Sequence, residues 1–225
     1  LIALISITRR QNSPRLKPLF SNRRGWLCFA AGAVIAVAGI LATDPNFPAK
    51  RIHIPQYFIL ALVLHRALSF DLPAPWIFPG AVLFAAVLGV HDELIQGLLP
   101  SRTFGLRDIG VNSLGALSGG AVGAGLSLFA ARVNKDLPTP NGATLFGIGA
   151  VVIGLALMLA PLEYFRDASI PVWTITPLLA AGFALCLISW RDPFSRTRPF
   201  AVFILITMTL PLYLLLSHAN TLNFH

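Results

Sequence analysis

Long apolar stretches alternate with short polar segments along the 225-residue chain. Seven of the apolar stretches approach the roughly 20 residues that an α-helix needs to cross a bilayer. Segments with two prolines each separate several of them, as at residues 44–48, 71–75 and 137–142, and such segments favour turns over continued helix. The pattern predicts transmembrane helices at about residues 26–42, 53–70, 76–99, 108–131, 144–161, 172–190 and 200–216.

The composition also places the chain among membrane proteins. Hydrophobic residues make up 56% of it and charged residues 12%, which is about half the charged fraction of an ordinary soluble domain. Helices that cross a bilayer satisfy their own backbone hydrogen bonds, and side-chain packing then joins them. We therefore expect an all-α, polytopic transmembrane helical bundle of about seven spans.

The basic residues predict how the bundle is oriented, and the formal net charge is +8. With the amino terminus inside, eleven basic residues fall in inner segments and five in outer segments, which favours a cytoplasmic amino terminus. Residues 1–25 then form a basic cytoplasmic segment, and residues 144–225 hold three further helices and a short tail. Nucleic-acid binding is not expected, because the basic residues are scattered between apolar stretches.

The third predicted helix ends in polar residues, with His91, Asp92 and Glu93 followed by Gln96. Charges within a membrane span cost about 2.5–3.5 kcal/mol each at the helix centre, so they mark functional candidates. Asp92 and Gln96 are four residues apart and share a helix face, whereas Glu93 points about 100° away from Asp92. We expect the face of Asp92 and Gln96 to meet the fourth helix.

The fourth predicted helix opens with Asp108 and Asn112 and continues with Gly115, Gly119 and Gly123. Their spacing puts all five on one helical stripe. The three glycines form two GxxxG steps, which let a neighbouring helix approach closely. Close packing of this kind would bring Asp108 and Asn112 towards the end of the third helix.

Two further segments reach the same depth of the membrane. His53 and Tyr57 lie one turn apart at the start of the second helix, and Arg102 lies in the loop after the third. Because successive helices run in opposite directions, these ends all lie on the outer side. The sequence therefore predicts one outer-leaflet polar site shared by three helices, with His53, Tyr57, Asp92, Glu93, Gln96, Arg102, Asp108 and Asn112 as its candidate residues.

These residues resemble the VanZ-like family of bacterial membrane proteins. The resemblance covers about residues 26–131, with Ser101 where the family usually has glycine. It implies an integral protein of the bacterial cytoplasmic (inner) membrane with a role in the cell envelope, since the family's founding association is with glycopeptide resistance, especially to teicoplanin. It is carried by Lys50-x-x-His53-x-x-x-Tyr57, Asp92-Glu93-x-x-Gln96, Pro100-x-Arg102 and Asp108-x-x-x-Asn112-x-x-Gly115-x-x-x-Gly119.

Three kinds of function fit this picture. The first is binding of a lipid-linked or cell-envelope headgroup, in which Arg102 supplies charge for a phosphate or carboxylate. The remaining polar groups would orient or bridge that headgroup: Asp92, Glu93, Asp108 and Asn112. The second is a structural or assembly subunit of a larger membrane complex, joined through the apolar last three helices and the glycine-rich fourth helix. The expected partners are accordingly membrane lipids and other membrane-protein subunits.

The third function is an intramembrane acid–base enzyme that uses Glu93 with His53 or Asp92. No GxSxG, HExxH or P-loop motif accompanies these residues. His53, Asp92 and Glu93 are also residue types that bind divalent metals, but no second histidine lies at ligand spacing. We therefore expect neither a metal nor a cofactor. His91 adjoins the carboxylates but projects to another helix face, so it is not expected to be a ligand.

Overall fold

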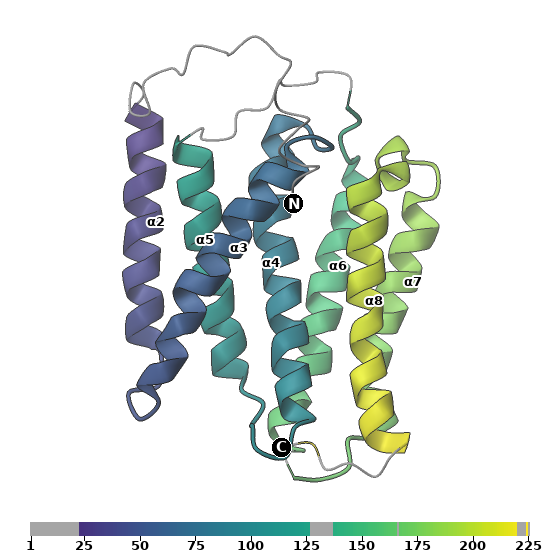
Figure 1. The fold of residues 1–225 in the computed structure, drawn as a ribbon. Helices are drawn as coiled ribbons and strands as arrows, with labels where there is room; N and C mark the ends of the chain where they lie inside the picture. Colours follow the sequence, from purple (N-terminus) through teal and green to yellow (C-terminus); the bar gives the residue numbers. More distant parts are fainter. Residues whose placement is uncertain (1–22, 127–136, 166, 220–223, 225) are drawn as a thin grey trace, which may run out of the picture.

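The computed structural model describes residues 23–126, 137–165, 167–219 and 224. Within this part the chain is all-helical, with no strand and one isolated β-bridge between Ala168 and Phe224. Seven α-helices run along the bundle (Figure 1): α2 (Arg23–Ala42), α3 (His53–Leu68), α4 (Ala74–Gly97), α5 (Leu106–Leu126), α6 (Gly142–Leu159), α7 (Thr176–Ser189) and α8 (Arg198–Ala219). The predicted all-α class is confirmed, and each predicted helix has a counterpart.

Short 3₁₀ helices and proline or asparagine residues mark most of the breaks between the long helices. Asn141 caps α6, since its side chain accepts a hydrogen bond of 2.8 Å from the backbone N–H of Thr144. Pro73 precedes α4 in an extended conformation, as its fixed φ angle favours. The 3₁₀ segments of the described chain are η2 (Pro48–Ile52), η3 (Ala160–Glu163), η4 (Val172–Ile175) and η5 (Pro193–Arg196).

Five helical segments of the described chain are long and apolar enough to cross a membrane, and they mark the chain as a membrane protein. They are Gly25–Ala42, Ala74–Gly97, Gly142–Glu163, Val172–Ser189 and Arg198–Ala219. The helices α3 and α5 fall outside this group: α3 has 16 residues, and α5 is rich in glycine and polar residues. These two less apolar helices pack against each other, and α5 is also covered by α2 and α4.

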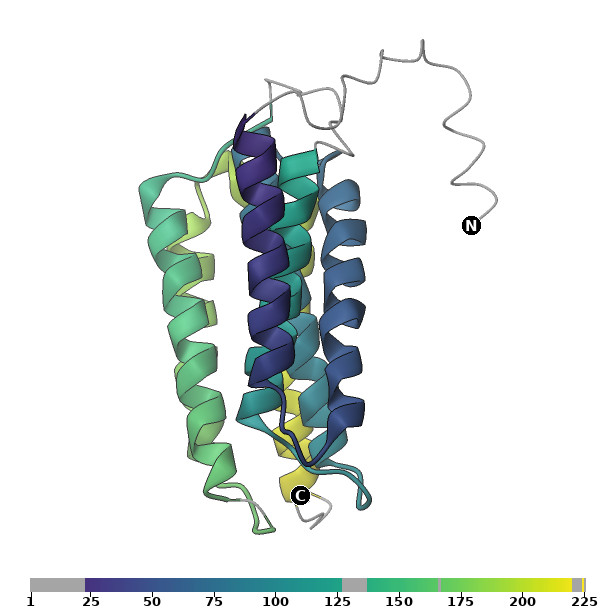
Figure 2. The same cartoon turned by 90° about the vertical axis from the view of Figure 1, so that its left-hand side faces the viewer.

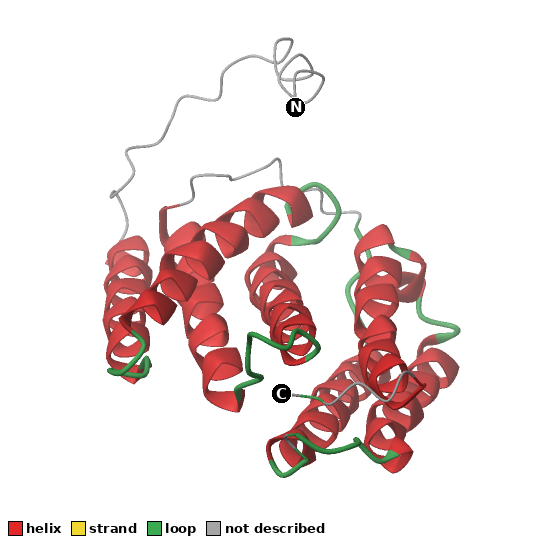
Figure 3. Cartoon of the chain, turned by 60° about the horizontal axis from the view of Figure 1, so that its bottom comes forward, coloured by secondary structure: helices red, strands yellow, loops and turns green. Residues whose placement is uncertain are grey.

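The bundle has two groups of helices. In the first group α5 contacts α2, α3 and α4, and α3 crosses the group on a slant (Figure 1). Figure 2 shows α2, α5 and α3 side by side from the other direction. In the second group α6 packs against α7, and α8 contacts both α7 and α4. Seen from the end at which α4 finishes, the helices stand side by side with short loops between them (Figure 3). Most of the basic segment predicted at residues 1–25 lies outside the part of the chain that the structure describes, which begins at residue 23.

The glycine stripe of α5 lies against α3. A Cβ atom on Gly119 would stand 2.2 Å from the carbonyl oxygen of Phe58, and one on Gly115 would stand 2.8 Å from that of Ile54. At Gly123 the side chain of His65 is the neighbour, at 3.3 Å. Because backbone atoms of α3 occupy the space of a side chain at two of these positions, only glycine allows this approach.

Candidate functional site

The polar residues gather at one end of the first helix group. The chain enters α3 and α5 at the end where α4 finishes, at the bottom of Figure 1. The three helices and the loop after α4 therefore bring eight side chains to one depth of the bundle. We call this set the polar cluster: His53 and Tyr57 from α3, Asp92, Glu93 and Gln96 from α4, Arg102 from the following loop, and Asp108 and Asn112 from α5.

Lys50 joins the polar cluster from η2, the short helix that leads into α3. Its ammonium group forms an ion pair and hydrogen bond with Oδ2 of Asp108, whose side chain is almost fully buried. Sequence reasoning named Lys50 only as part of the family resemblance and not among the site residues. The sequence feature that could have identified Lys50 as a site residue is its position three residues before His53, just ahead of the helix that carries His53 and Tyr57.

Asp92 contacts α3. The Tyr57 hydroxyl donates a hydrogen bond of 3.3 Å to Oδ2 of Asp92, and Nδ1 of His53 lies 3.9 Å from the same oxygen. The His53 and Tyr57 rings are nearly parallel, with an angle of 8° between their planes, as expected one turn apart on one helix face. We expected the helix face of Asp92 to meet the fourth helix. The partners of its carboxylate instead lie on α3, because the slant of α3 brings Tyr57 and His53 to that face of α4.

Glu93 is the most deeply buried carboxylate of the polar cluster, with no exposed surface. Its Oε1 accepts a long hydrogen bond of 3.4 Å from the Gln96 amide, and its Oε2 has no hydrogen-bond partner among the described residues. Gln96 in turn accepts a bond of 3.0 Å from the exposed guanidinium of Arg102. A polar path therefore runs from the surface at Arg102 to the buried Glu93.

Asn112 is also fully buried, and neither atom of its side-chain amide has a partner within the described chain. It lies beside Gly89, where an added Cβ would meet the Asn112 Cβ at 3.0 Å and a ring carbon of Tyr57 at 3.3 Å. The absence of a side chain at Gly89 makes room for both polar residues. A buried amide with unmet hydrogen bonds costs free energy, so it points to a group that would satisfy it.

The loop that presents Arg102 is anchored by an aromatic contact. Phe104 is 1% exposed and packs against Phe224, with 5.2 Å between ring centroids. Phe224 also fills the space over Gly97, where a Cβ would stand 2.4 Å from its ring. The end of the chain therefore returns to the same end of the bundle, a contact that no local sequence pattern signals.

His91 projects away from the polar cluster, as its position on the helix predicts. One ring nitrogen lies 3.1 Å from the Tyr213 hydroxyl, and the other lies 2.8 Å from the carbonyl oxygen of Ile206. Both partners belong to α8, so His91 links the two helix groups. This role leaves no ring nitrogen for a ligand.

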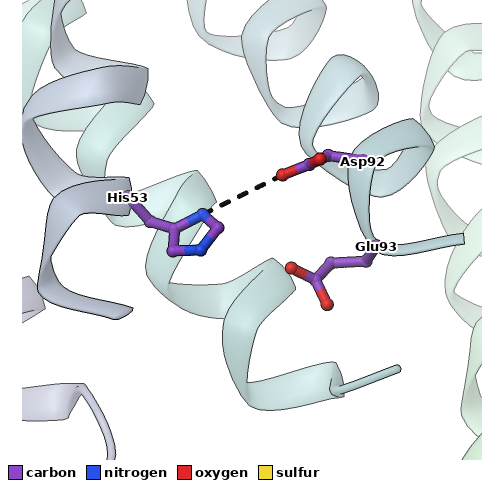
Figure 4. Close-up of side chains that lie close together, drawn as sticks. All are labelled: His53, Asp92 and Glu93. Carbon is purple, nitrogen blue, oxygen red and sulfur yellow. Dashed lines mark ion pairs between the residues drawn. The ribbon is translucent and has the colours of Figure 1, made fainter. Parts of the chain in front are cut away.

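Three of the residues also form a possible cation site. His53, Asp92 and Glu93 each offer one ligand atom, and these atoms lie within 4.8 Å of one another (Figure 4). Sequence reasoning expected no metal because it found no second histidine at ligand spacing. The three residues come from two helices, α3 and α4, so spacing along a single helix does not show that they come together.

The arrangement combines two neighbouring carboxylates, the buried Glu93 and the partly exposed Asp92, with an exposed cation at its rim. Asp92 and Glu93 lie at the α3–α4 contact, and Arg102 stands at the surface above Gln96. Such a set can bind a polar group through charge and hydrogen bonds without any nucleophile. The chain matches no family profile, no curated protein and no solved structure.

Proposed function

We propose that the chain is a VanZ-like integral protein of the bacterial cytoplasmic membrane that binds the anionic headgroup of a cell-envelope lipid. The polar cluster lies in the outer leaflet and faces outward, with the amino terminus in the cytoplasm and all seven helices crossing the membrane. Arg102 contacts the phosphate or carboxylate, and the inner residues of the cluster position the rest of the headgroup.

The observation that carries this proposal is the polar path from the exposed Arg102 to the buried Glu93. A guanidinium binds phosphate and carboxylate groups strongly, since it offers several N–H donors in a fixed plane. Arg102 donates a hydrogen bond to the neutral amide of Gln96 and not to a carboxylate, so its charge is not offset by that partner. It is therefore available to an anionic group that approaches from the membrane surface.

The unmet hydrogen bonds below Arg102 support a ligand that reaches into the bundle. Asn112 has both a free donor and a free acceptor among the described residues, and Glu93 has a free acceptor. Headgroups of envelope lipids carry hydroxyl and amide groups that can meet these needs. A site built only to hold helices together would leave fewer buried polar atoms unsatisfied.

The orientation is supported by the distribution of basic residues, which are more numerous in the segments on the amino-terminal side of the membrane. The polar residues of α3 and α5 are compatible with spanning because α2 and α4 cover α5 and α4 covers α3. Their polar residues then face protein and not lipid chains, as charged residues within membranes generally do.

Native mass spectrometry of the purified protein tests the proposal. The protein is mixed with dioleoyl phosphatidic acid, dioleoyl phosphatidylglycerol or dioleoyl phosphatidylcholine, and bound lipid is counted. We expect the anionic lipids to be retained over the zwitterionic one, and Arg102→Ala to weaken their retention by about tenfold, the loss of one charge-assisted hydrogen bond.

The matched control is Arg51→Ala, which removes an equal charge from an exposed arginine in η2, near the same end of the bundle. We expect it to retain anionic lipid as the unmodified protein does. Equal losses in Arg102→Ala and Arg51→Ala would show general attraction to a basic surface and would contradict a defined headgroup site.

A further inference from the structure

We propose that His53, Asp92 and Glu93 bind one divalent ion of a first-row transition metal, such as Mn²⁺ or Zn²⁺, at the contact between α3 and α4. This inference deepens the proposed function, since a bound cation would add to the attraction of an anionic headgroup. Metal binding is measured on the protein without lipid, so its result does not depend on whether a headgroup binds.

The geometry is the first support. Figure 4 shows the imidazole of His53 and the two carboxylates pointing towards a common space. Nδ1 of His53 lies 3.9 Å from Oδ2 of Asp92 across one side of it. The three ligand atoms lie within 4.8 Å of one another. Tetrahedral ligand atoms about 2.0–2.2 Å from a bound Zn²⁺ lie about 3.3–3.6 Å from one another, which is about 1.2 Å or more closer than the 4.8 Å limit found here. Small side-chain rotations would close that difference.

The second support is independent of the distances and comes from unmet hydrogen bonds. Glu93 has no exposed surface and His53 is 8% exposed, so both are more than nine-tenths buried. Oε2 of Glu93 and Nδ1 of His53 have no hydrogen-bond partner in the described part of the chain. Both atoms are lone-pair donors to metals, and a buried carboxylate oxygen needs a proton, a hydrogen-bond donor or a cation.

The third support is the distribution of charge. Asp92 and Glu93 are adjacent carboxylates, and no lysine or arginine forms an ion pair with either within the described residues. The two nearby cationic side chains are engaged elsewhere, because Lys50 pairs with Asp108 and Arg102 bonds Gln96. A buried carboxylate, Glu93, and a partly exposed one, Asp92, therefore lie side by side without a lysine or arginine ion pair, at the position where a divalent ion would offset both charges.

The ligand types favour a transition metal over Mg²⁺ or Ca²⁺. Magnesium and calcium prefer sets of oxygen ligands, whereas an imidazole nitrogen suits Zn²⁺, Fe²⁺ and Ni²⁺, and the two carboxylates suit Mn²⁺. Three protein ligands also leave a coordination position open to water or to a phosphate oxygen. Tyr57 supports the set from outside, since its hydroxyl donates to Asp92 and fixes the position of that carboxylate.

Binding of Mn²⁺ to the purified protein, stripped of metals with a chelator and kept in detergent without added lipid, tests the inference. The electron paramagnetic resonance signal of free Mn²⁺ falls as the ion binds, so a titration gives affinity and stoichiometry. We expect one ion per chain, and Zn²⁺ added in excess should displace it. His53→Ala and Glu93→Gln should each weaken binding by at least about tenfold.

The matched control is His218→Ala, which removes an exposed histidine of α8 and should leave the affinity unchanged. Gel filtration of each variant establishes that it is folded, and the near-isosteric Glu93→Gln keeps the test valid where His53→Ala does not fold. The inference is overturned by a dissociation constant weaker than about 1 mM for the unmodified protein, or by equal binding in both ligand variants and the control. Either result leaves retention of anionic lipids untouched, so it is distinct from failure of the headgroup proposal.

Discussion

The hydroxyl of Tyr57 on α3 donates a hydrogen bond of 3.3 Å to Oδ2 of Asp92 on α4. This contact connects two helices at the depth where His53 and Glu93 also lie. It holds the Asp92 carboxylate in place, whereas the side-chain amide of Asn112, Oε2 of Glu93 and Nδ1 of His53 have no hydrogen-bond partner within the described residues. A substitution at this contact can therefore distinguish its effect on the stability of the helix packing from its effect on ligand binding.

Tyr57→Phe removes this hydroxyl and keeps the ring that packs beside Asn112. We expect a loss of about 1 kcal/mol in stability, which is the usual net value of one hydrogen bond. Because Asp92 is then less well oriented, Mn²⁺ affinity should fall by a smaller factor than in Glu93→Gln. Thermal unfolding and the Mn²⁺ titration measure the two effects. An affinity loss as large as that of Glu93→Gln would mean that Tyr57 itself is a ligand.

Because α3 and α5 approach each other closely, we expect a methyl group at position 119 to lower the stability of the protein strongly. The added Cβ would stand 2.2 Å from the Phe58 carbonyl oxygen, so the helices must separate. Gly119→Ala should destabilise the protein by about 1–3 kcal/mol, the usual cost of overpacking. The midpoint of thermal unfolding in detergent checks this value.

Gly110→Ala provides the control on the same helix. A Cβ at Gly110 has no heavy atom within 4 Å, so the substitution should leave the unfolding midpoint unchanged or raise it slightly. Similar destabilisation in both alanine variants would show that helix propensity, and not the contact with α3, governs the result.

Asp192 predicts a pH dependence at the far end of the bundle from the polar cluster. Burial raises the pKa of this carboxyl, but hydrogen bonds from Thr144, Asn141 and Phe194 outweigh burial and hold the pKa below its ordinary value. The bond from the Thr144 hydroxyl is 2.5 Å and that from the Asn141 amide is 3.0 Å. Because the folded pKa is the lower one, the stabilisation is complete above the unfolded pKa of about 3.9 and is lost as pH falls through the folded value.

Unfolding midpoints at pH 7 and pH 3 test this effect. At pH 7 Asp192→Asn should be less stable than the unmodified protein by about 1–2 kcal/mol, since charged hydrogen bonds are lost. The difference should shrink towards pH 3, and Asp71→Asn serves as a control for the loss of one carboxylate. A difference that stays constant between the two pH values would contradict the account of Asp192.

The sequence could predict most of the helices and the meeting of three helix ends. The helices follow from long apolar stretches and from breaks at residues such as Pro73 and Asn141. The meeting of His53, Glu93 and Asp108 follows from the alternating direction of successive helices. These features depend on local sequence and on simple chain geometry.

The contacts within the polar cluster could not be predicted in the same way. The slant of α3 turns Asp92 towards Tyr57, and the return of the chain places Phe224 against Phe104. Both contacts depend on how whole helices pack and not on spacing within one helix. The partner of Lys50 is a residue 58 positions away, so no local pattern identifies it.

The orientation of the bundle predicts which loop is reachable from outside the cell. In a background without Cys28 and Cys186, the Ser101→Cys variant should react with a membrane-impermeant maleimide in intact cells. The Arg196→Cys variant, on an exposed residue of η5 beyond the opposite ends of the helices, should react only after the cells are opened. The reverse pattern would place the amino terminus outside and the polar cluster on the cytoplasmic side.

The central claim is that the polar cluster is a ligand site and not a network that holds the helices together. The unfolding midpoint of Glu93→Gln without added ligand tests it most directly, because Glu93 is fully buried and has an unpaired oxygen. Residues placed for function often reduce stability, so the account predicts a midpoint equal to or above that of the unmodified protein. A fall of more than about 3 °C, which corresponds to roughly 1 kcal/mol for a chain of this size, would show that Glu93 stabilises the fold and would contradict the claim.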